Sequence, residues 1–291
     1  MARFLASKIN KIPVPNSILG EGPLWSPSQS GLYWVDILGK KINFYNLTNG
    51  YKFWQFEKMP SAMAECQDGR LIVAMQDMLI KFDPVSGESV HWLDLDTDLP
   101  RNRSNDGKCD PLGNFWIGTM QHEPQQKTGR LWRVDPQGQK TKILDGIGIS
   151  NTLAWDVERH RFYFADSMAG EISSYDWHPA GQLANGQVFA SNQGADWTPD
   201  GSTIDSDGYV WNAQWDGGRI VRYTPDGEID QILELPVKCP TSCTFGGPNL
   251  STLYITTAAS EVSAAAEDPL GGALLAVETC FKGLAAHQYA G

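Results

Sequence analysis

The sequence repeats a pair of apolar, β-type runs six times, and this repeat constrains the fold more than any other feature of the chain. The first run of each copy covers residues 32–35, 71–74, 115–118, 162–165, 210–213 and 253–256. The second run covers residues 42–45, 79–82, 131–134, 172–175, 220–223 and 274–277. Successive copies lie roughly 38 to 48 residues apart, which is the spacing of propeller blades with four strands each. The sequence therefore predicts an all-β, six-bladed β-propeller, with four antiparallel strands per blade around a central channel.

The repeat also limits how the chain divides into domains. It runs from Glu21 to Val277 in a chain of 291 residues and leaves no room for a boundary, so we expect residues 1–291 to form a single propeller domain. Trp34, Trp116 and Trp211 recur at strand positions, which predicts that they pack between blades.

Composition excludes several classes of function. The net charge of −11 and the lack of a basic cluster argue against nucleic acid or an anionic membrane as a partner. No run of about 18 apolar residues is present, and the N-terminus lacks a secretory apolar region. The five cysteines are an odd number without the paired spacing of a zinc site. We expect a cytoplasmic protein that is a monomer or a weak homo-oligomer.

Comparing the repeats at equivalent positions reveals a candidate site. Roughly eight to ten residues before the turn that precedes the middle run, four blades carry an acid or a carboxamide. These residues are Glu21 in blade 1, Asn105 and Asp106 in blade 3, Asn151 in blade 4 and Asp200 in blade 5. Blades 2 and 6 carry Ser61 and Thr241, which are less suited to binding a cation. Because equivalent positions point toward the same end of the channel, we expect these side chains to converge.

Such a cluster of oxygen ligands indicates a cation. Carboxylates that crowd together in a buried volume repel one another unless a cation or a proton compensates. Hard oxygen ligands suit Ca²⁺, Mg²⁺ or Mn²⁺, while Zn²⁺ or Fe²⁺ is also possible. For any one of these residues a solvated strand end is the simpler interpretation, but the agreement of four blades favours a shared site.

Arg103 adds a candidate for binding a ligand. Alternation along a strand sends Arg103 and Asn105 to the same side, so both could meet a bound molecule. An arginine there could orient a hydroxyl-rich or carbonyl-rich substrate, or it could pair with a neighbouring acid. Trp197 and Trp215 flank the segment that contains Asp200 and could line the same pocket.

Seven segments resemble the regucalcin/gluconolactonase family of sugar lactonases, in order over nearly the whole chain. They are LGEGPLW at 19–25, RSNDGK at 103–108, GTM at 118–120, ISNTLAW at 149–155, PDG at 199–201, GGRI at 217–220 and TSCTFGG at 241–247. The resemblance implies a six-bladed propeller with one divalent metal ion, held by Glu21, Asn151 and Asp200. It also implies substrate contacts by Arg103, Asn105 and Glu123, with Asp106 close to the metal. The chain departs from the family at Thr152, where many members have glycine after the asparagine.

The chemistry that the resemblance implies is metal-dependent opening of a sugar aldonolactone to the aldonic acid. The metal would polarise the lactone carbonyl, and Asp200 would be the general base for the attacking water. One alternative is a related propeller hydrolase, such as a calcium-dependent phosphotriesterase or another lactonase. A second is a propeller without enzymatic activity, either a calcium-binding regulatory protein or an interaction platform. Loss of lactone hydrolysis on chelation would separate these alternatives.

Overall fold

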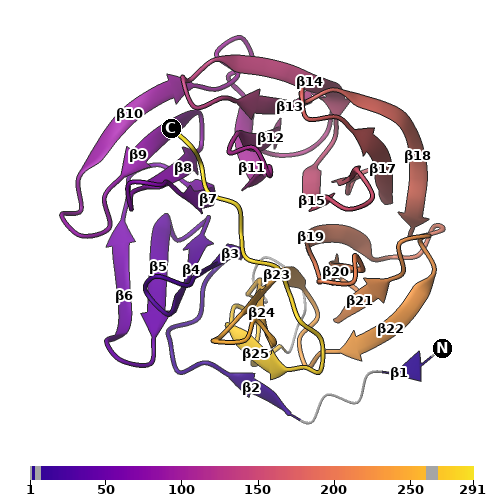
Figure 1. The fold of residues 1–291 in the computed structure, drawn as a ribbon. Helices are drawn as coiled ribbons and strands as arrows, with labels where there is room; N and C mark the ends of the chain where they lie inside the picture. The colour runs from indigo at the N-terminus through magenta and orange to yellow at the C-terminus, as the bar shows by residue number, and fades with distance from the viewer. Residues whose placement is uncertain (1, 4–7, 260–267) are drawn as a thin grey trace.

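Six β-sheets, five of four strands and one with a short fifth strand, surround a central channel in the computed structural model, which describes residues 2–3, 8–259 and 268–291 (Figure 1). The elements of the described residues are all strands. The prediction of an all-β, six-bladed propeller with four antiparallel strands per blade is therefore confirmed. No helix in the described part of the chain is both long enough and apolar enough to cross a bilayer.

The strands follow the chain around the ring, from the innermost to the outermost strand of each blade. Blade 1 consists of β3 (Gly20–Ser26), β4 (Gly31–Asp36), β5 (Lys41–Asn46) and β6 (Gly50–Gln55). Blade 2 consists of β7 (Pro60–Glu65), β8 (Leu71–Met75), β9 (Met78–Phe82) and β10 (Ser89–Asp94). Blade 3 consists of β11 (Asn102–Cys109), β12 (Phe115–Gln121), β13 (Gly129–Val134) and β14 (Lys140–Ile147).

The remaining three blades repeat this order. Blade 4 consists of β15 (Ser150–Asp156), β16 (Arg161–Asp166), β17 (Glu171–Trp177) and β18 (Leu183–Ser191). Blade 5 consists of β19 (Thr198–Ile204), β20 (Val210–Trp215), β21 (Arg219–Tyr223) and β22 (Ile229–Glu234), and β1 (Ala2–Arg3) joins β22 in parallel. Blade 6 consists of β23 (Pro240–Gly246), β24 (Thr252–Thr257), β25 (Leu275–Glu278) and β2 (Ile9–Lys11).

The ring closes through a strand from the other end of the chain. The outermost strand of blade 6 is β2, which pairs antiparallel with β25 so that Ile9 lies opposite Val277. Figure 1 shows this strand beside the blade that the last part of the chain builds. Because backbone hydrogen bonds here join residues far apart in sequence, opening the ring would break blade 6.

The core lies between neighbouring blades rather than in one central layer. Every residue of β4, β8 and β12 is buried, as expected for strands that are covered on both faces. Trp34, Trp116 and Trp211 are at most 1% exposed, and each belongs to a cluster of buried apolar residues. Trp116 contacts Trp155 of blade 4 edge-on, with ring centroids 5.5 Å apart. The prediction that these tryptophans pack between blades is confirmed.

Each innermost strand carries a β-bulge near its start, and these bulges position the candidate site. In β3, the three residue steps from Glu21 to Leu24 lie opposite two steps from Val35 to Tyr33. The register shifts in the same way after Pro60, Ser104, Asn151, Pro199 and Pro240. A bulge bends its strand and re-aims the neighbouring side chains. Bulges at equivalent positions therefore direct side chains of different blades toward the same end of the channel.

Candidate functional site

A cavity of about 180 Å³ lies at the end of the channel where the innermost strands begin. Four blades supply its charged and carboxamide side chains, which are Glu21 from β3, Arg103 and Asn105 from β11, Asn151 from β15 and Asp200 from β19. The rest of the wall consists of two hydroxyl residues and five apolar ones: Ser167, Thr198, Leu19, Ile37, Met120, Ile149 and Trp215. Five of the residues that the sequence singled out thus face one small volume, and Trp215 faces it too, whereas Trp197 is not in the lining.

Two other hollows are less suited to chemistry. A groove of about 690 Å³ runs between blades 1 and 6, and its lining is mainly apolar and aromatic, with Glu278 as its one charged side chain. A smaller cavity of about 80 Å³ lies deeper in the channel, beneath Ala285 and His287. The cavity at the strand starts is the candidate site because it alone among these three combines two acids, an arginine and two carboxamides.

The bulge positions of blades 2 and 6 do not contribute to this cavity. The Ser61 hydroxyl lies 2.7 Å from that of Ser104 and is buried. The Thr241 hydroxyl donates to the Gly20 carbonyl at 2.5 Å and lies 2.8 Å from the Thr256 hydroxyl. Both hydroxyls are therefore satisfied by neighbouring protein groups and leave no oxygen for a ligand.

Hydrogen bonds fix the orientation of the two carboxamides. Asn151 Nδ2 donates to the Ser167 hydroxyl at 2.8 Å, and that hydroxyl donates to the Pro199 carbonyl at 2.6 Å. Asn105 Nδ2 donates to the Ser150 carbonyl at 3.0 Å and to Asn151 Oδ1 at 3.2 Å. Ser167 thus occupies the amide nitrogen of Asn151, while the carbonyl oxygen Oδ1, which accepts one hydrogen bond from Asn105, keeps a second lone pair for a cation.

Arg103 shares the cavity with the acids. Its Nη1 donates to Asn105 Oδ1 at 2.7 Å and to the Ser104 carbonyl at 2.9 Å. Burial lowers the pKa of its guanidinium to about 10, and the charges of Glu21 and Asp200 act in the opposite direction. The side chain therefore remains charged near neutral pH and retains donors for a further partner.

The acids of the site are buried close to one another. Burial, followed by the charge of Asp106, raises the pKa of Glu21 to about 8. Burial and then the charges of Glu21 and Asp106 raise the pKa of Asp200 well above its usual value. The Glu21 and Asp200 carboxyl groups interact directly, and two carboxylates this close repel each other unless a proton or a cation compensates. A divalent cation could replace that proton and stabilise both carboxylates in their ionised form.

Asp106 lies behind this pair rather than in the cavity wall. Burial raises the pKa of its carboxyl group, which lines the deeper channel cavity. Its Oδ1 accepts a hydrogen bond from the Gly107 amide at 2.9 Å, while its buried Oδ2 has no partner within the described structure. An unpartnered, buried carboxylate oxygen beside two other acids is costly and adds to the local negative charge.

The donor set fits a hard divalent cation. In the described part of the chain, no three His, Cys, Asp or Glu side chains meet in metal-binding geometry. The cavity instead combines the carboxylates of Glu21 and Asp200 with the carboxamide of Asn151. Carboxylate and amide oxygens are ligands for Ca²⁺, Mg²⁺ and Mn²⁺, and the raised pKa values of the two buried acids show that positive charge is favoured between them.

Glu123 is the one predicted site residue that the structure leaves outside this region. It is exposed and lines a separate hollow of about 360 Å³ with Arg101, Gln121 and His122. The loop is fixed by Gln121, whose Oε1 accepts hydrogen bonds from the amides of Gln125 and Gln126 at 2.9 and 3.0 Å. The structure therefore does not bring Glu123 together with Glu21, Asn151 and Asp200.

Sequence reasoning missed the supporting role of Ser167. Its hydroxyl connects Asn151 to blade 5, although no motif marks it. Ser150 pairs with Asp166 across β15 and β16, so the repeat itself places the next residue, Ser167, beside the end of β15 that carries Asn151. The strand register, together with a hydroxyl side chain at position 167, is the signal in the sequence that points to Ser167.

Comparison with known proteins gives a consistent result. The family model for the SMP-30/gluconolactonase/LRE-like region matches residues 19–259. A 6-deoxy-6-sulfogluconolactonase of Pseudomonas putida is 33% identical over 281 residues, covering 94% of this chain and 96% of the relative. An L-arabinolactonase of Azospirillum brasilense is 33% identical over 284 residues, covering 94% of this chain and 92% of the relative.

A solved structure agrees over nearly the whole fold. The crystal structure of a calcium-binding protein, regucalcin, from Agrobacterium tumefaciens is 30% identical to this chain. It superposes with a TM-score of 0.88 and covers 94% of this chain and 95% of its own. The matched region includes Glu21, Asn151 and Asp200. The chain therefore belongs to the SMP-30/gluconolactonase/LRE-like family.

Proposed function

We propose that the protein is a divalent-metal-dependent sugar lactonase, which hydrolyses an aldonolactone to the corresponding aldonic acid. The observation that carries this proposal is the cavity of about 180 Å³, in which an acid pair, a carboxamide and an arginine face one volume. The names of the relatives from Pseudomonas putida and Azospirillum brasilense support a lactone as the substrate class.

The metal would be held by Glu21, Asn151 and Asp200. These residues offer two carboxylates and one amide oxygen, which suit Ca²⁺, Mg²⁺ or Mn²⁺ and also admit Zn²⁺ or Fe²⁺. When bound, a divalent ion supplies Lewis-acid activation of the lactone carbonyl. Because three protein ligands are fewer than Ca²⁺ usually takes, we expect loose selectivity among divalent ions.

The side chains of the cavity would then carry out the proton transfers. Water adds to the lactone carbonyl carbon while the ionised Asp200 carboxylate accepts its proton. The bond between that carbon and the ring oxygen breaks, and Asp200 returns the proton to the ring oxygen. One water is consumed, and the product is an open-chain hydroxy acid. A single carboxylate can serve both steps because it is base in the first and acid in the second.

Arg103 and Asn105 would orient the sugar. Asn105 holds Arg103 Nη1 in place at 2.7 Å, and the remaining guanidinium donors can bind substrate hydroxyl or carbonyl oxygens. Leu19, Ile37 and Trp215 give the cavity an apolar wall beside these polar groups. A contribution of Glu123 to substrate binding stays a prediction.

An acid-release assay with a panel of pentono- and hexonolactones tests the proposal. We expect turnover of at least one lactone, loss of turnover after chelation, and recovery when Ca²⁺, Mg²⁺, Mn²⁺, Zn²⁺ or Fe²⁺ is added. Full activity in the chelated protein would contradict the metal-dependent mechanism. Hydrolysis of phosphotriesters instead of lactones would favour the related propeller hydrolases. Ion binding without turnover of any ester would favour a regulatory calcium-binding protein.

A further inference from the structure

Thr152 has an unusual backbone conformation next to the proposed metal ligand Asn151. Its φ angle is +53°, in the left-handed region, and its side chain is fully buried. Threonine is β-branched, and β-branched residues are genuine outliers in this region. In blade 1 the residue after Glu21 has almost the same φ angle, +52°, but there it is Gly22, which adopts it without strain. The fold thus tolerates strain at residue 152 that a glycine would remove.

The Thr152 hydroxyl makes contacts that a glycine cannot make. Its Oγ1 donates to the Asp200 carbonyl at 2.5 Å and lies 3.0 Å from the Ser202 hydroxyl. Asn212 Nδ2 donates to the same Oγ1 at 3.2 Å and to the Asp200 carbonyl at 3.0 Å. All these groups are buried, so the hydroxyl joins blade 4 directly to the backbone of the proposed general base.

The left-handed turn also directs the backbone of blade 4 toward blade 3. The backbone amides of Thr152 and Leu153 lie near the Asp106 carboxylate and act against the rise in its pKa that burial causes. Residue 152 therefore has its amide near Asp106 and its hydroxyl on the Asp200 carbonyl, while its chain neighbour Asn151 lines the cavity. One residue connects three of the blades that supply the site.

We propose that Thr152 is a positioning residue, whose hydroxyl holds the main chain of Asp200 so that the carboxylates of Asp200 and Glu21 meet in the cavity. This inference rests on the proposed role of Asp200 as ligand and base. The strain at Thr152 persists because the hydroxyl, rather than the backbone conformation, is what the site needs. A side chain with only a structural role would contribute to folding but leave the affinity of the site unchanged.

Three substitutions separate these roles. Thr152→Ser keeps the hydroxyl, Thr152→Val keeps the branched shape without the hydroxyl, and Thr152→Gly removes both the hydroxyl and the strain. Thr257→Val is a matched control, because Thr257 is equally buried and donates to the Ala273 carbonyl at 2.7 Å outside the cavity lining. Mn²⁺ affinity is measured by calorimetry on chelator-treated protein without lactone, and melting temperature, kcat and KM are measured in parallel.

We expect the Mn²⁺ affinity of Thr152→Ser to stay within about twofold of the wild type. Thr152→Val and Thr152→Gly should bind Mn²⁺ about tenfold more weakly, because each loses one buried hydrogen bond. Thr152→Gly should melt no lower than Thr152→Val, because it lacks the strain, and yet bind Mn²⁺ as weakly. Thr257→Val should lose stability without losing Mn²⁺ affinity. Wild-type affinity in folded Thr152→Gly and Thr152→Val would overturn the inference, and if Thr152→Val does not fold, the Ser and Gly variants decide.

A structural readout keeps this test independent of the proposed function. If the wild type binds no divalent ion, the proposed metal site is wrong, and crystal structures of the metal-free Thr152→Gly and Thr152→Ser variants then decide. Displacement of the Asp200 carboxylate from Glu21 in the Gly variant but not in the Ser variant would support the positioning role. An unmoved Asp200 in both variants would refute it.

Discussion

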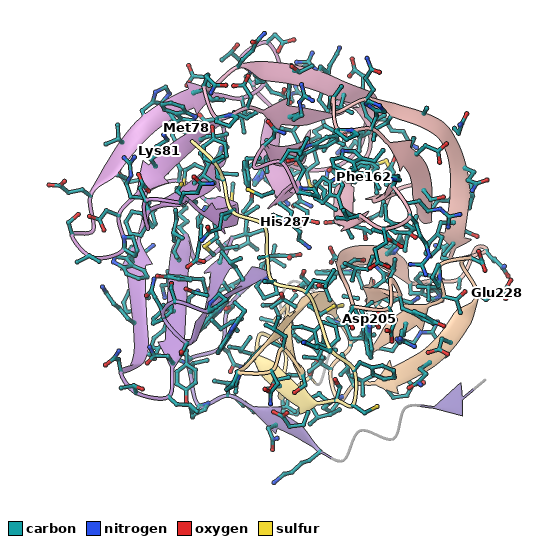
Figure 2. The ribbon with its side chains drawn as sticks, in the orientation of Figure 1. Met78, Lys81, Phe162, Asp205, Glu228 and His287 are labelled. Carbon is teal, nitrogen blue, oxygen red and sulfur yellow. The ribbon has the colours of Figure 1, made fainter. Side chains whose placement is uncertain are left out.

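The two ends of the channel differ in whether their buried polar groups have hydrogen-bond partners. At one end, Glu21, Asp106 and Asp200 are buried close together with raised pKa values, and Asp106 Oδ2 lacks a partner in the described structure. At the other end, the segment after β25 crosses the ring from blade 6 toward blades 2 and 3 (Figure 1), and Figure 2 shows His287 on this segment over the channel. That end is tied to the blades by backbone hydrogen bonds.

The segment that crosses the channel makes hydrogen bonds to the blades, whereas Asp106 Oδ2 at the site has no hydrogen-bond partner in the described structure. The Ser206 amide donates to the Lys282 carbonyl at 2.7 Å, and the Ala290 amide donates to the Gly113 carbonyl at 3.0 Å. Tyr289 is fully buried, and its hydroxyl donates to the Asp135 carbonyl at 2.6 Å. One end of the channel thus adds stability, while the other holds repelling acids that Arg103 compensates only in part and that a ligand or a proton can compensate further. Mutations at the two ends should therefore have opposite signatures.

The largest expected effect is at the charged end. Asp200→Ala should lower kcat/KM by about a thousandfold or more, because it removes a residue that is both a proposed metal ligand and the proposed base. The metal-free variant should be at least as stable as the wild type, since one of the repelling acids is gone. Kinetics and thermal melts in chelator would check both expectations, with the exposed Asp226→Ala as a control on the same blade. Substantial turnover in folded, metal-loaded protein would contradict the assignment.

At the end of the channel that the segment after β25 crosses, a mutation should lower stability and leave catalysis unchanged. Tyr289→Ala removes a fully buried aromatic ring and its hydrogen bonds to Asp135 and Trp92. We expect a loss of about 3–5 kcal/mol in the free energy of unfolding, as for other buried aromatic residues replaced by alanine. The kcat per folded molecule should stay near the wild-type value. Denaturant titration gives the first quantity, and a large fall in kcat without loss of stability would show that the two ends are coupled.

Arg103→Ala should reduce turnover without weakening the metal site. We expect kcat/KM to fall on the order of a hundredfold, the effect of losing a charged hydrogen bond worth about 3 kcal/mol. Mn²⁺ affinity should not fall, because Arg103 adds positive charge beside the proposed ligands. The exposed Arg101→Ala, two residues away in a different hollow, is the matched control. If the melting temperature of Arg103→Ala falls while its kcat/KM stays at the wild-type value, Arg103 has only a structural role.

The raised pKa values make the stability of the metal-free protein depend on pH. Burial, followed by the charge of Asp106, raises the pKa of Glu21 from 4.5 to about 8, so the folded state keeps a proton that the unfolded chain releases. Stability from this group is complete below about pH 4.5 and is lost as the pH rises through about 8. Melting temperature in chelator should therefore fall from pH 5 to pH 8.

Divalent metal should reverse this trend. In the proposed site Mn²⁺ would compete with protons for the same carboxylates, so it should raise the melting temperature more at pH 8 than at pH 5. Glu21→Gln should flatten the pH dependence in chelator, because the variant has no proton to lose at this position. A metal-free wild type that becomes more stable between pH 5 and pH 8 would show that the acid pair is not as desolvated as the structure indicates.

The fold and the residues that face the channel axis could be predicted from the sequence because the sequence repeats. Self-similar runs made residues of different blades comparable, so Glu21, Asn151 and Asp200 could be aligned without knowledge of their contacts. The hydroxyls of Thr152 and Ser167 could not be found in this way. Their importance depends on hydrogen bonds between blades, which are set by bulge geometry and not by residue type. The comparison of blades predicts where side chains point, but it does not predict what holds them there.

Glu123 tests the limit of that reasoning, and it carries the smallest expected effect. It was assigned by resemblance, it lies in the loop between β12 and β13 rather than at a repeat position, and it is exposed outside the cavity. An exposed side chain loses rotamer freedom when it binds, so a contact there contributes about 1 kcal/mol or less. We therefore expect Glu123→Ala to change kcat/KM by no more than about fivefold, with Glu158→Ala as an exposed control. A loss of kcat/KM as large as that of Arg103→Ala would mean that this loop closes over the bound lactone. The site would then include the loop at the outer edge of blade 3 as well as the cavity.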